Sequence, residues 1–344
     1  MRSRLQYSVI DAHSAGAPAR VVIGGAPHVS GANMAEIRDT YEREHDDVRK
    51  FLMYEPRGFS EMCGSILMPP CDPRADFGIV FIETGGWMTM CGAGTIGAAT
   101  VVVETGMVAA VEPVTTVTFD TPAGLVTAEV EVSDGAVQGV TIENVPSFLY
   151  ATDQRIEVPG HGTVTVDIAY GGNFYAIASA SAFGLSVIPE HSARLAEAGR
   201  LLRAAVNKAV TVEHPTEGPA GPIPLVILME DELQPDGASR NLVFFGESGI
   251  DRSPGGTGTS ARMAQRYGRG RQQLGETYIQ ESIIGTRFEG RLVRTTRLGD
   301  TDAVIPTIRG RAHITATTTF HLDPDDPYPH GFGVGYASDA TRRR

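Results

Sequence analysis

The stretch "CGAGTIGAATVVVETG", residues 91–106, recurs in altered form as "GGTGTSARMAQRYGRG", residues 255–270. Both copies read x-G-x-G-T before small residues and a helical pattern, and the second starts 164 positions after the first. Each follows a strand-like segment, residues 77–90 and 241–254. We predict two similar halves, each with a glycine-rich helix start after a strand. The alternative is that such turns recur by chance in proteins with helices and strands.

Length and composition favour a globular protein with two domains. The chain has 344 residues, of which 42% are hydrophobic and 20% are charged, which is enough material for two cores. Val and Thr alternate between Gly, Asp-Gly and Pro in residues 114–146, as in antiparallel hairpins. The predicted class is therefore mixed α/β (α+β) with mainly antiparallel sheet. We divide the chain into residues 1–145 and 146–322, and residues 323–344 are a candidate completion of the first half.

The charge of the chain excludes several partners. The formal net charge is −12 and no basic stripe offsets it, so nucleic acid and anionic membrane are not expected to bind. The arginine run 342–344 is interpreted as a solvated tail. Neither a signal-peptide pattern nor an apolar run long enough to span a bilayer is present, which predicts a cytoplasmic protein.

Cys91 is the candidate reactive cysteine. The chain contains three cysteines without a C-x-x-C pair or histidines at metal-ligand spacing, so neither a disulfide scaffold nor a metal site is predicted. A thiol at a helix start is expected to have a lowered pKa, which makes the thiolate available as a base or nucleophile. The alternative, a buried thiol without chemistry, is the usual role of a lone cysteine and is kept for Cys63 and Cys71.

Two glycine-rich helix starts suit a small carboxylate ligand. Unpaired N–H groups and the helix dipole attract an anion there. Phosphate is the competing ligand, but neither turn has the lysine of a phosphate-binding loop, and the G-x-G-x-x-G match that begins at Gly92 lacks a βαβ unit. Asp251 precedes the second turn and is a candidate partner for a substrate ammonium, which predicts an amino-acid site. The alternative is that Asp251 pairs with Arg252 or caps the turn.

Several separate motifs, taken together, resemble the proline racemase family, which includes hydroxyproline epimerases and hydroxyproline dehydratases. The motifs stand in the family's order along most of the chain: "SAGAPARVVIGGAP" (14–27), "LMYEPRG" (52–58), "MCGAGTIGAAT" (90–100), "ETGMV" (104–108), "YGGNFYAI" (170–177), "DRSPGGTGTSARMA" (251–264), "ESIIGTRFEG" (281–290) and "DPDDPYPHGF" (323–332). The resemblance implies two pseudo-symmetric domains of curved sheet around a central helix, as in diaminopimelate epimerase, with the active site in the cleft between them.

The resemblance also implies how the reaction proceeds and which residues take part. Catalysis in the family needs neither cofactor nor metal: the Cys91 thiolate removes the α-proton of a proline-like amino acid. Amides at both helix starts hold the substrate carboxylate, and Asp251 holds the ring nitrogen. A homodimer is one option for the assembly. The amides that the resemblance assigns to the carboxylate are those of Gly92, Ala93, Gly256 and Thr257.

The chain departs from the family pattern at four positions. Gly255 stands where racemases and epimerases of the family have a second cysteine and dehydratases often have threonine. Ala93 replaces a usual histidine, and Ala17 replaces a frequent glutamate. Phe59 follows "EPRG" where histidine is common, and by this position it is a candidate substrate contact. Because glycine has no proton to give, an enzyme that inverts the α-carbon would lack one of its two acids or bases.

Elimination needs a base on one face only, so the leading hypothesis is dehydration of trans-3-hydroxy-L-proline to a pyrroline carboxylate, with Cys91 as the base. One alternative is a proline racemase or hydroxyproline 2-epimerase that uses water as the second acid, or that has lost a cysteine from position 255 by mutation. Another is an enzyme or binding protein repurposed for a bulkier amino acid, since Gly255 and Ala93 leave extra volume.

Overall fold

A computed structural model describes residues 3, 5–246 and 249–333 of the chain. Two compact units divide it: Met1–Ile142 with Gly310–Arg344, and Glu143–Arg309. The predicted arginine tail, residues 342–344, lies outside the described residues, as does the end of the 323–344 segment. No helix in the described part of the chain is long and apolar enough to cross a membrane.

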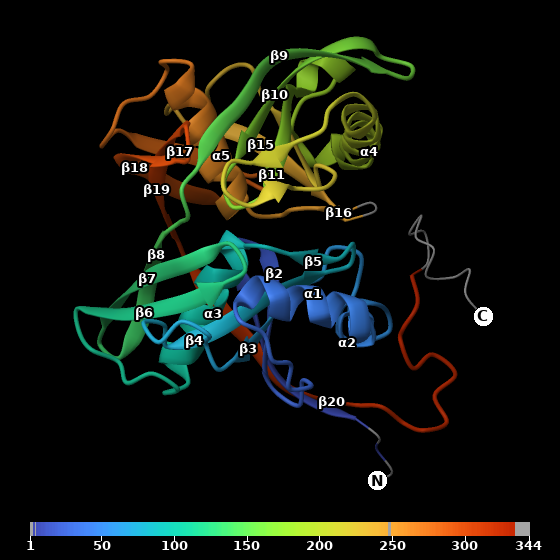
Figure 1. The fold of residues 1–344 in the computed structure, drawn as a ribbon, viewed down its shortest axis with the longest axis vertical. Coiled ribbons are helices and arrows are strands. Elements are labelled where there is room, and N and C mark those ends of the chain that lie inside the picture. Colours follow the sequence, from blue (N-terminus) through green and yellow to red (C-terminus); the bar gives the residue numbers. More distant parts are fainter. Residues whose placement is uncertain (1–2, 4, 247–248, 334–344) are drawn as a thin grey trace. The chain divides into compact units, whose positions relative to one another are not determined.

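The first unit is a curved sheet with one helix inside it and two shorter helices outside (Figure 1). Its elements are β1 (Gln6–Ser14), β2 (Ala17–Gly24), α1 (Met34–Glu44), α2 (Asp46–Met53), β3 (Cys63–Met68), β4 (Phe77–Glu83), β5 (Trp87–Met88), α3 (Gly92–Glu104), β6 (Val114–Thr121), β7 (Gly124–Ser133), β8 (Ala136–Glu143) and β20 (Ala312–His321). The paired strands run in the order β20, β1, β2, β3, β4, β6 and β7, and β5 pairs with β4.

The second unit repeats this plan. Its elements are β9 (Phe148–Val158), β10 (Gly162–Tyr170), β11 (Phe174–Ser179), η1 (Ala180–Phe183), η2 (Pro189–His191), α4 (Ser192–Ala209), β12 (Glu213–His214), β13 (Gly218–Pro219), β14 (Leu225–Met229), β15 (Ser239–Phe245), β16 (Gly249–Ile250), α5 (Gly256–Gly268), β17 (Thr277–Glu281), β18 (Arg287–Leu298) and β19 (Thr301–Gly310). The paired strands run in the order β9, β10, β11, β14, β15, β17, β18 and β19, and β16 pairs with β15.

Strand directions show that the two units have the same topology. In the first unit, neighbouring strands from β20 to β7 pair antiparallel, antiparallel, parallel, antiparallel, parallel and antiparallel. From β9 to β18 the second unit shows the same series. The short strands β5 and β16 occupy equivalent places, and a helix follows each. The predicted mixed α and β class with mainly antiparallel sheet is confirmed, and the repeat at residues 91 and 255 marks equivalent elements.

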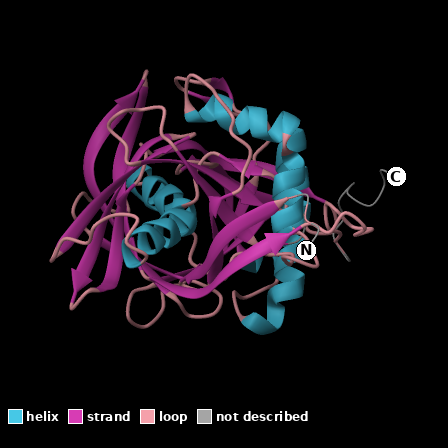
Figure 2. Cartoon of the chain, turned by 90° about the horizontal axis from the view of Figure 1, so that it is seen from below, coloured by secondary structure: helices cyan, strands magenta, loops and turns pink. Residues whose placement is uncertain are grey.

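Each unit encloses its central helix with strands of its own sheet. Helix α3 contacts β1, β2, β3, β7 and β20, and α5 contacts β9, β10, β11 and β18; Figure 2 shows such curved strands around a helix. Residues 92–103 of α3 are all buried, which is why small and branched apolar side chains follow the glycines on every face. Helix α5 is buried from Gly256 to Gln265 and carries polar side chains inside.

The C-terminal boundary of the second unit differs from the division that the sequence suggested. That division placed residues 310–322 in the second half, but these residues include β20 (Ala312–His321), which pairs with β1 from Gln6↔His321 to Ser14↔Ala312. A strand belongs with the sheet that satisfies its backbone hydrogen bonds, so β20 completes the first unit.

Candidate active site

Cys91 caps the N-terminus of α3. It follows β5, has an extended backbone (φ −136°, ψ 109°), and its Sγ accepts a hydrogen bond from the Gly94 amide at 3.3 Å. Its carbonyl accepts from both the amide and the hydroxyl of Thr95, each at 2.8 Å. A thiol in this position lies at the positive end of the helix dipole, and the donated N–H favours its thiolate form. The side chain is partly exposed.

Glycine at position 94 makes room for the thiol. A Cβ added there would lie 3.2 Å from Cys91 Sγ and 3.2 Å from the Phe81 ring. These distances are shorter than ordinary van der Waals contacts, so a larger residue would push the sulfur away from the amide that it accepts from. The glycine-rich motif therefore serves the position of the thiol as well as the exposure of the backbone.

Gly255 occupies the equivalent place at the N-terminus of α5, but without a side-chain cap. Its backbone has φ +81°, a conformation that favours glycine. A Cβ added there would lie 2.8 Å from Val243 Cγ2 and 3.7 Å from Asp251 Oδ2. The backbone and the packing at this turn are thus both adapted to glycine.

Asp251 leads into this second turn. Its Oδ1 accepts a hydrogen bond from the Ser253 amide at 2.7 Å, and its own amide donates to the Val243 carbonyl at 2.8 Å. Loss of hydration raises the pKa of its carboxyl group to about 6, although the Ser253 hydrogen bonds and the Arg252 charge act in the opposite direction. Asp251 therefore shapes the turn, as one of the two predictions has it, and its carboxylate is poorly solvated. Its contact with a substrate ammonium stays a prediction.

The amides predicted to hold a carboxylate lie in the first turns of the two helices. In the part of the chain that the structure describes, the N–H groups of Gly92, Ala93, Gly256 and Thr257 have no hydrogen-bond partner, as the first turn of a helix allows. The Gly255 amide, in contrast, donates to Ser253 Oγ at 3.1 Å. Each helix start on its own can accept an anion. Their shared role with one substrate remains a prediction.

Tyr175 is a residue that the sequence did not single out. Its hydroxyl lies 2.6 Å from Thr257 Oγ1, and both side chains are buried. Tyr175 is on β11, within the motif "YGGNFYAI", and the neighbouring Gly171 allows this part of the chain to approach α5: a Cβ at Gly171 would lie 2.2 Å from the Thr257 carbonyl oxygen. The motif was visible in the sequence, but its contact with α5 was not.

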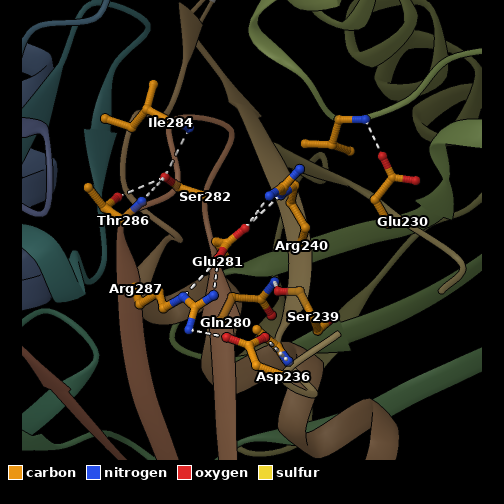
Figure 3. A network of polar contacts seen from close by, with 12 residues as sticks. Glu230, Asp236, Ser239, Arg240, Gln280, Glu281, Ser282, Ile284, Thr286 and Arg287 are labelled. Carbon is orange, nitrogen blue, oxygen red and sulfur yellow. Dashed lines mark hydrogen bonds and ion pairs between the residues drawn. The ribbon is translucent and has the colours of Figure 1, made fainter. Parts of the chain in front are cut away.

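A polar network supports the loop beside Arg252 (Figure 3). Glu281, at the end of β17, accepts from Arg240 Nε at 2.8 Å and from Arg287 Nε at 2.7 Å. Burial alone would raise the pKa of Glu281, but these two guanidinium groups outweigh it and lower the pKa. The loop that Glu281 and Arg287 anchor reaches the second turn, where the Thr286 hydroxyl donates to the Arg252 carbonyl at 3.4 Å.

Phe59, predicted to contact substrate, lies in the loop between α2 and β3. Its side chain is 48% exposed, and its carbonyl accepts the Met62 amide at 2.9 Å. The Thr84 hydroxyl holds this loop by donating to the Ser60 carbonyl at 2.8 Å. The substrate contact of Phe59 stays a prediction.

Two further expectations from the sequence concern disulfide bonds and metal ligands. None of Cys63, Cys71 and Cys91 forms a disulfide bond within the described residues. Burial raises the pKa of the Cys71 thiol, with smaller effects of Asp120 and Glu36 in the same direction. Over residues 3, 5–246 and 249–333, no three His, Cys, Asp or Glu side chains come together in a group that could hold a metal ion.

Comparisons with known proteins match nearly the whole chain. A family profile described as Proline racemase matches residues 9–333. The 4-hydroxyproline 2-epimerase of Streptosporangium roseum is 49% identical over 96% of this chain and 99% of that protein. The proline racemase of Clostridioides difficile is 42% identical over 96% of this chain and 99% of that protein. A crystal structure of a hydroxyproline epimerase from Agrobacterium vitis, with bound trans-4-hydroxy-L-proline, has a TM-score of 0.93 at 34% identity and covers 99% of this chain and 100% of that one.

Proposed function

This chain is an enzyme of the proline racemase family, and from that premise we propose that Cys91 removes the α-proton of a hydroxyproline-type amino acid in a reaction with a single protein base. We further propose that elimination of water completes the reaction, with trans-3-hydroxy-L-proline as the substrate. The product is then a pyrroline carboxylate. The observation that carries this proposal is the difference between the two helix starts: a thiol at Cys91 and no side chain at Gly255.

Inversion of the α-carbon needs a second proton donor. In the racemases and epimerases that this chain resembles, a cysteine at the position of residue 255 has this role. Loss of such a group costs a factor of about 10² to 10⁴ in rate. The conformation of this turn suits glycine, because φ is +81° and a Cβ at residue 255 would lie 2.8 Å from Val243 Cγ2.

Elimination balances with one base. The Cys91 thiolate takes the α-proton, the electron pair of that C–H bond forms the double bond between Cα and Cβ, and the C–O bond at Cβ breaks with loss of the hydroxyl. A proton from water or from the Thr257 hydroxyl makes the leaving group water. Tyr175, 2.6 Å from Thr257 Oγ1, is placed to return a proton to Thr257. The enamine that results tautomerises to the imine.

Binding of the substrate carboxylate is assigned to the unpaired amides at the helix starts, which also stabilise the negative charge that develops as the α-proton leaves. Asp251 is assigned to the substrate nitrogen. Because its pKa is raised to about 6, Asp251 is ionised at pH 7 and above, where it can pair with a cationic nitrogen, and it loses this charge as pH falls through 6.

A second candidate function, 2-epimerisation of 4-hydroxyproline, is favoured by a separate observation. The relative from Streptosporangium roseum that is 49% identical over almost the whole chain is named 4-hydroxyproline 2-epimerase. In this chain water would have to supply the second proton, so we expect a slower reaction than in a two-cysteine enzyme.

Proton NMR in deuterated water distinguishes these functions. The enzyme is incubated separately with trans-3-hydroxy-L-proline, trans-4-hydroxy-L-proline and L-proline. We expect the 3-hydroxy substrate to lose water and the others to show slow α-deuterium incorporation or none. Rapid inversion of 4-hydroxyproline with an inert 3-hydroxyproline would replace dehydration by epimerisation. If none of the three exchanges its α-proton, the proposed substrate class is wrong.

A further inference from the structure

Helix α5 carries a buried arginine without a carboxylate partner, well beyond the helix start. Arg262 is 6% exposed, and its Nη1 donates a hydrogen bond to the amide oxygen of Gln265. Its Nε is buried without a partner, and no ion pair to Arg262 occurs within the described ranges. A buried guanidinium whose Nε has no partner is costly unless an anion compensates it.

Asp167, which is linked to Arg262 through the side chain of Gln265, does not supply that anion. Gln265 stands between Arg262 and Asp167: its Oε1 accepts from Arg262, and its Nε2 donates to Asp167 Oδ2 at 2.5 Å. Asp167 is also held by Arg269, which donates to its two oxygens at 2.7 and 2.6 Å. Asp167 is therefore already compensated, and the amide of Gln265 keeps it apart from Arg262.

Arg262 lines a cavity of about 360 Å³ that lies entirely within the second unit. This volume is in the range of small-molecule sites. Arg266, one turn further along α5, and Arg269, which caps the C-terminus of the helix, also line it. Arg266 packs over the Tyr278 ring at 5.1 Å, and its buried Nε has no partner in the part of the chain that is described. We call this space the α5 cavity.

Carboxylates without a cationic partner line the same cavity. Glu230 accepts the Val187 amide, and Asp231 accepts the Ser181 hydroxyl at 2.5 Å. Figure 3 shows Glu230 with its single dashed contact, while the nearby Arg240 is bound to Glu281. Among the residues described, neither Glu230 nor Asp231 forms an ion pair. The α5 cavity thus offers an uncompensated guanidinium and uncompensated carboxylates together.

We propose that the α5 cavity binds a small amino-acid zwitterion, with its carboxylate on Arg262 and its ammonium on Glu230 and Asp231. Planar guanidinium groups suit carboxylates because they donate two parallel hydrogen bonds. This site lies further along α5 than its glycine-rich start and is independent of the function proposed above, since it needs neither Cys91 nor Asp251. Its occupancy would supply the missing charge at the buried part of the helix that begins at Gly256.

The test is calorimetric titration of the full-length protein with three probes at constant ionic strength: glycine, acetate and methylammonium. Glycine carries both charges and the others carry one each. We expect glycine to bind at least about threefold more tightly than acetate, and methylammonium to bind least. Equal affinities for glycine and acetate, or no binding of glycine, would overturn the proposal.

Variants locate the binding. Arg262→Met is expected to weaken glycine binding at least about tenfold. Arg262→Lys should weaken it less, because lysine keeps the positive charge but cannot donate two parallel hydrogen bonds. Glu230→Gln combined with Asp231→Asn should reduce the glycine affinity to that for acetate, and it tests the site even if Arg262→Met fails to fold. Arg294→Met, at an exposed arginine that pairs with Glu143, is the control and should change nothing. Unchanged glycine binding in Arg262→Met would overturn the proposal.

The outcome is separable from that of the proposed reaction. Cys91→Ala should leave the Arg262-dependent binding of glycine intact while it stops α-proton exchange. Loss of both in Cys91→Ala would contradict the assignment of glycine to the α5 cavity.

Discussion

The starts of α3 and α5 are built on the same backbone plan and differ in their chemistry. Both follow a short strand, both open with G-x-G-T, and both are enclosed by strands in the same order of directions. At α3 the cap is Cys91, whose sulfur accepts an amide of its own helix. At α5 the cap is Gly255, which has no side chain and a positive φ.

This difference shows how a duplicated fold can divide its tasks. The strand pairing that encloses each helix depends on many residues and has stayed alike. The reactive group depends on one side chain, so a single position can turn a candidate acid or base into bare backbone. The second unit instead has Asp251 before its turn and a hydroxyl pair, Thr257 and Tyr175, after it.

The largest expected effect comes from removing the thiol. Cys91→Ala should lower the rate of α-proton exchange by at least about 10³-fold, because no other base is assigned to the substrate. The rate is measured as loss of the α-proton signal in deuterated water. Cys63→Ala, at a second cysteine, in β3, is the matched control and should retain nearly full activity. If α-proton exchange persists in Cys91→Ala, Cys91 is not the base. The difference between Cys91 and Gly255 would then no longer support the proposed function.

Giving the second helix start a thiol is the converse change. Gly255→Cys should lower the free energy of unfolding by about 3 kcal/mol, since a side chain at φ +81° is strained and its Cβ would lie 2.8 Å from Val243 Cγ2. Urea unfolding measures it.

Gly86→Cys is the control for that substitution, because a Cβ there meets nothing within 4 Å. Adding Val243→Ala to Gly255→Cys should recover part of the lost stability. Equal stability of Gly255→Cys and Gly86→Cys would mean that the turn tolerates a cysteine, and the two helix starts would then differ less than the structure indicates.

The raised pKa of Asp251 predicts that the stability of the second unit depends on pH. Because its pKa is raised to about 6 from 3.8, the folded state binds the proton more tightly than the unfolded state. The cost of the charged carboxylate is present above pH 6 and is relieved as pH falls through 6 towards 4. Asp251→Asn should therefore be more stable than the unsubstituted protein by about 3 kcal/mol at pH 8, with little difference near pH 4.

Thermal or urea unfolding across this pH range checks the prediction for Asp251. Asp39→Asn, at an exposed carboxylate on α1, serves as the control and should not show the same dependence. A stability difference that is constant from pH 4 to pH 8 would contradict the role of charge.

The smallest expected effect comes from replacing two equivalent glycines, one near the start of α3 and one near the start of α5. Gly94→Ala should lower turnover about tenfold, since its Cβ would lie 3.2 Å from Cys91 Sγ and would displace the thiol. A Cβ at Gly258 would lie 3.2 Å from Val243 Cγ2 and 3.6 Å from the Tyr175 ring, and the second of these is an ordinary contact, so we expect a similar loss of stability and a smaller loss of turnover. Steady-state kinetics measures the loss of turnover, and urea unfolding measures the loss of stability, so the two effects can be separated. Equal losses of turnover would show that the packing of both helices matters more than the position of the thiol.

Local patterns in the sequence predicted the elements of the fold better than their pairing. The hairpin β6–β7 and helix α4 follow from alternation and helical periodicity, because both signals act between near neighbours. The partner of β20 could not be predicted in this way, since β1 is about three hundred positions away and nothing local specifies it. Arg262 would be assigned to the exposed face of an amphipathic helix, yet the surrounding sheet buries it.

What the sequence by itself determined is the chemistry available at each position: a thiol at Cys91, no side chain at Gly255, and glycine-rich helix starts that leave amides unpaired. What only the tertiary structure decided is how that chemistry is supported. The distance between Val243 and position 255, the Thr257–Tyr175 contact and the unpaired Arg262 all depend on residues brought together from distant parts of the chain. Side-chain identity is a property of the sequence, whereas burial, strain and partnership arise from packing between elements, which local sequence does not encode.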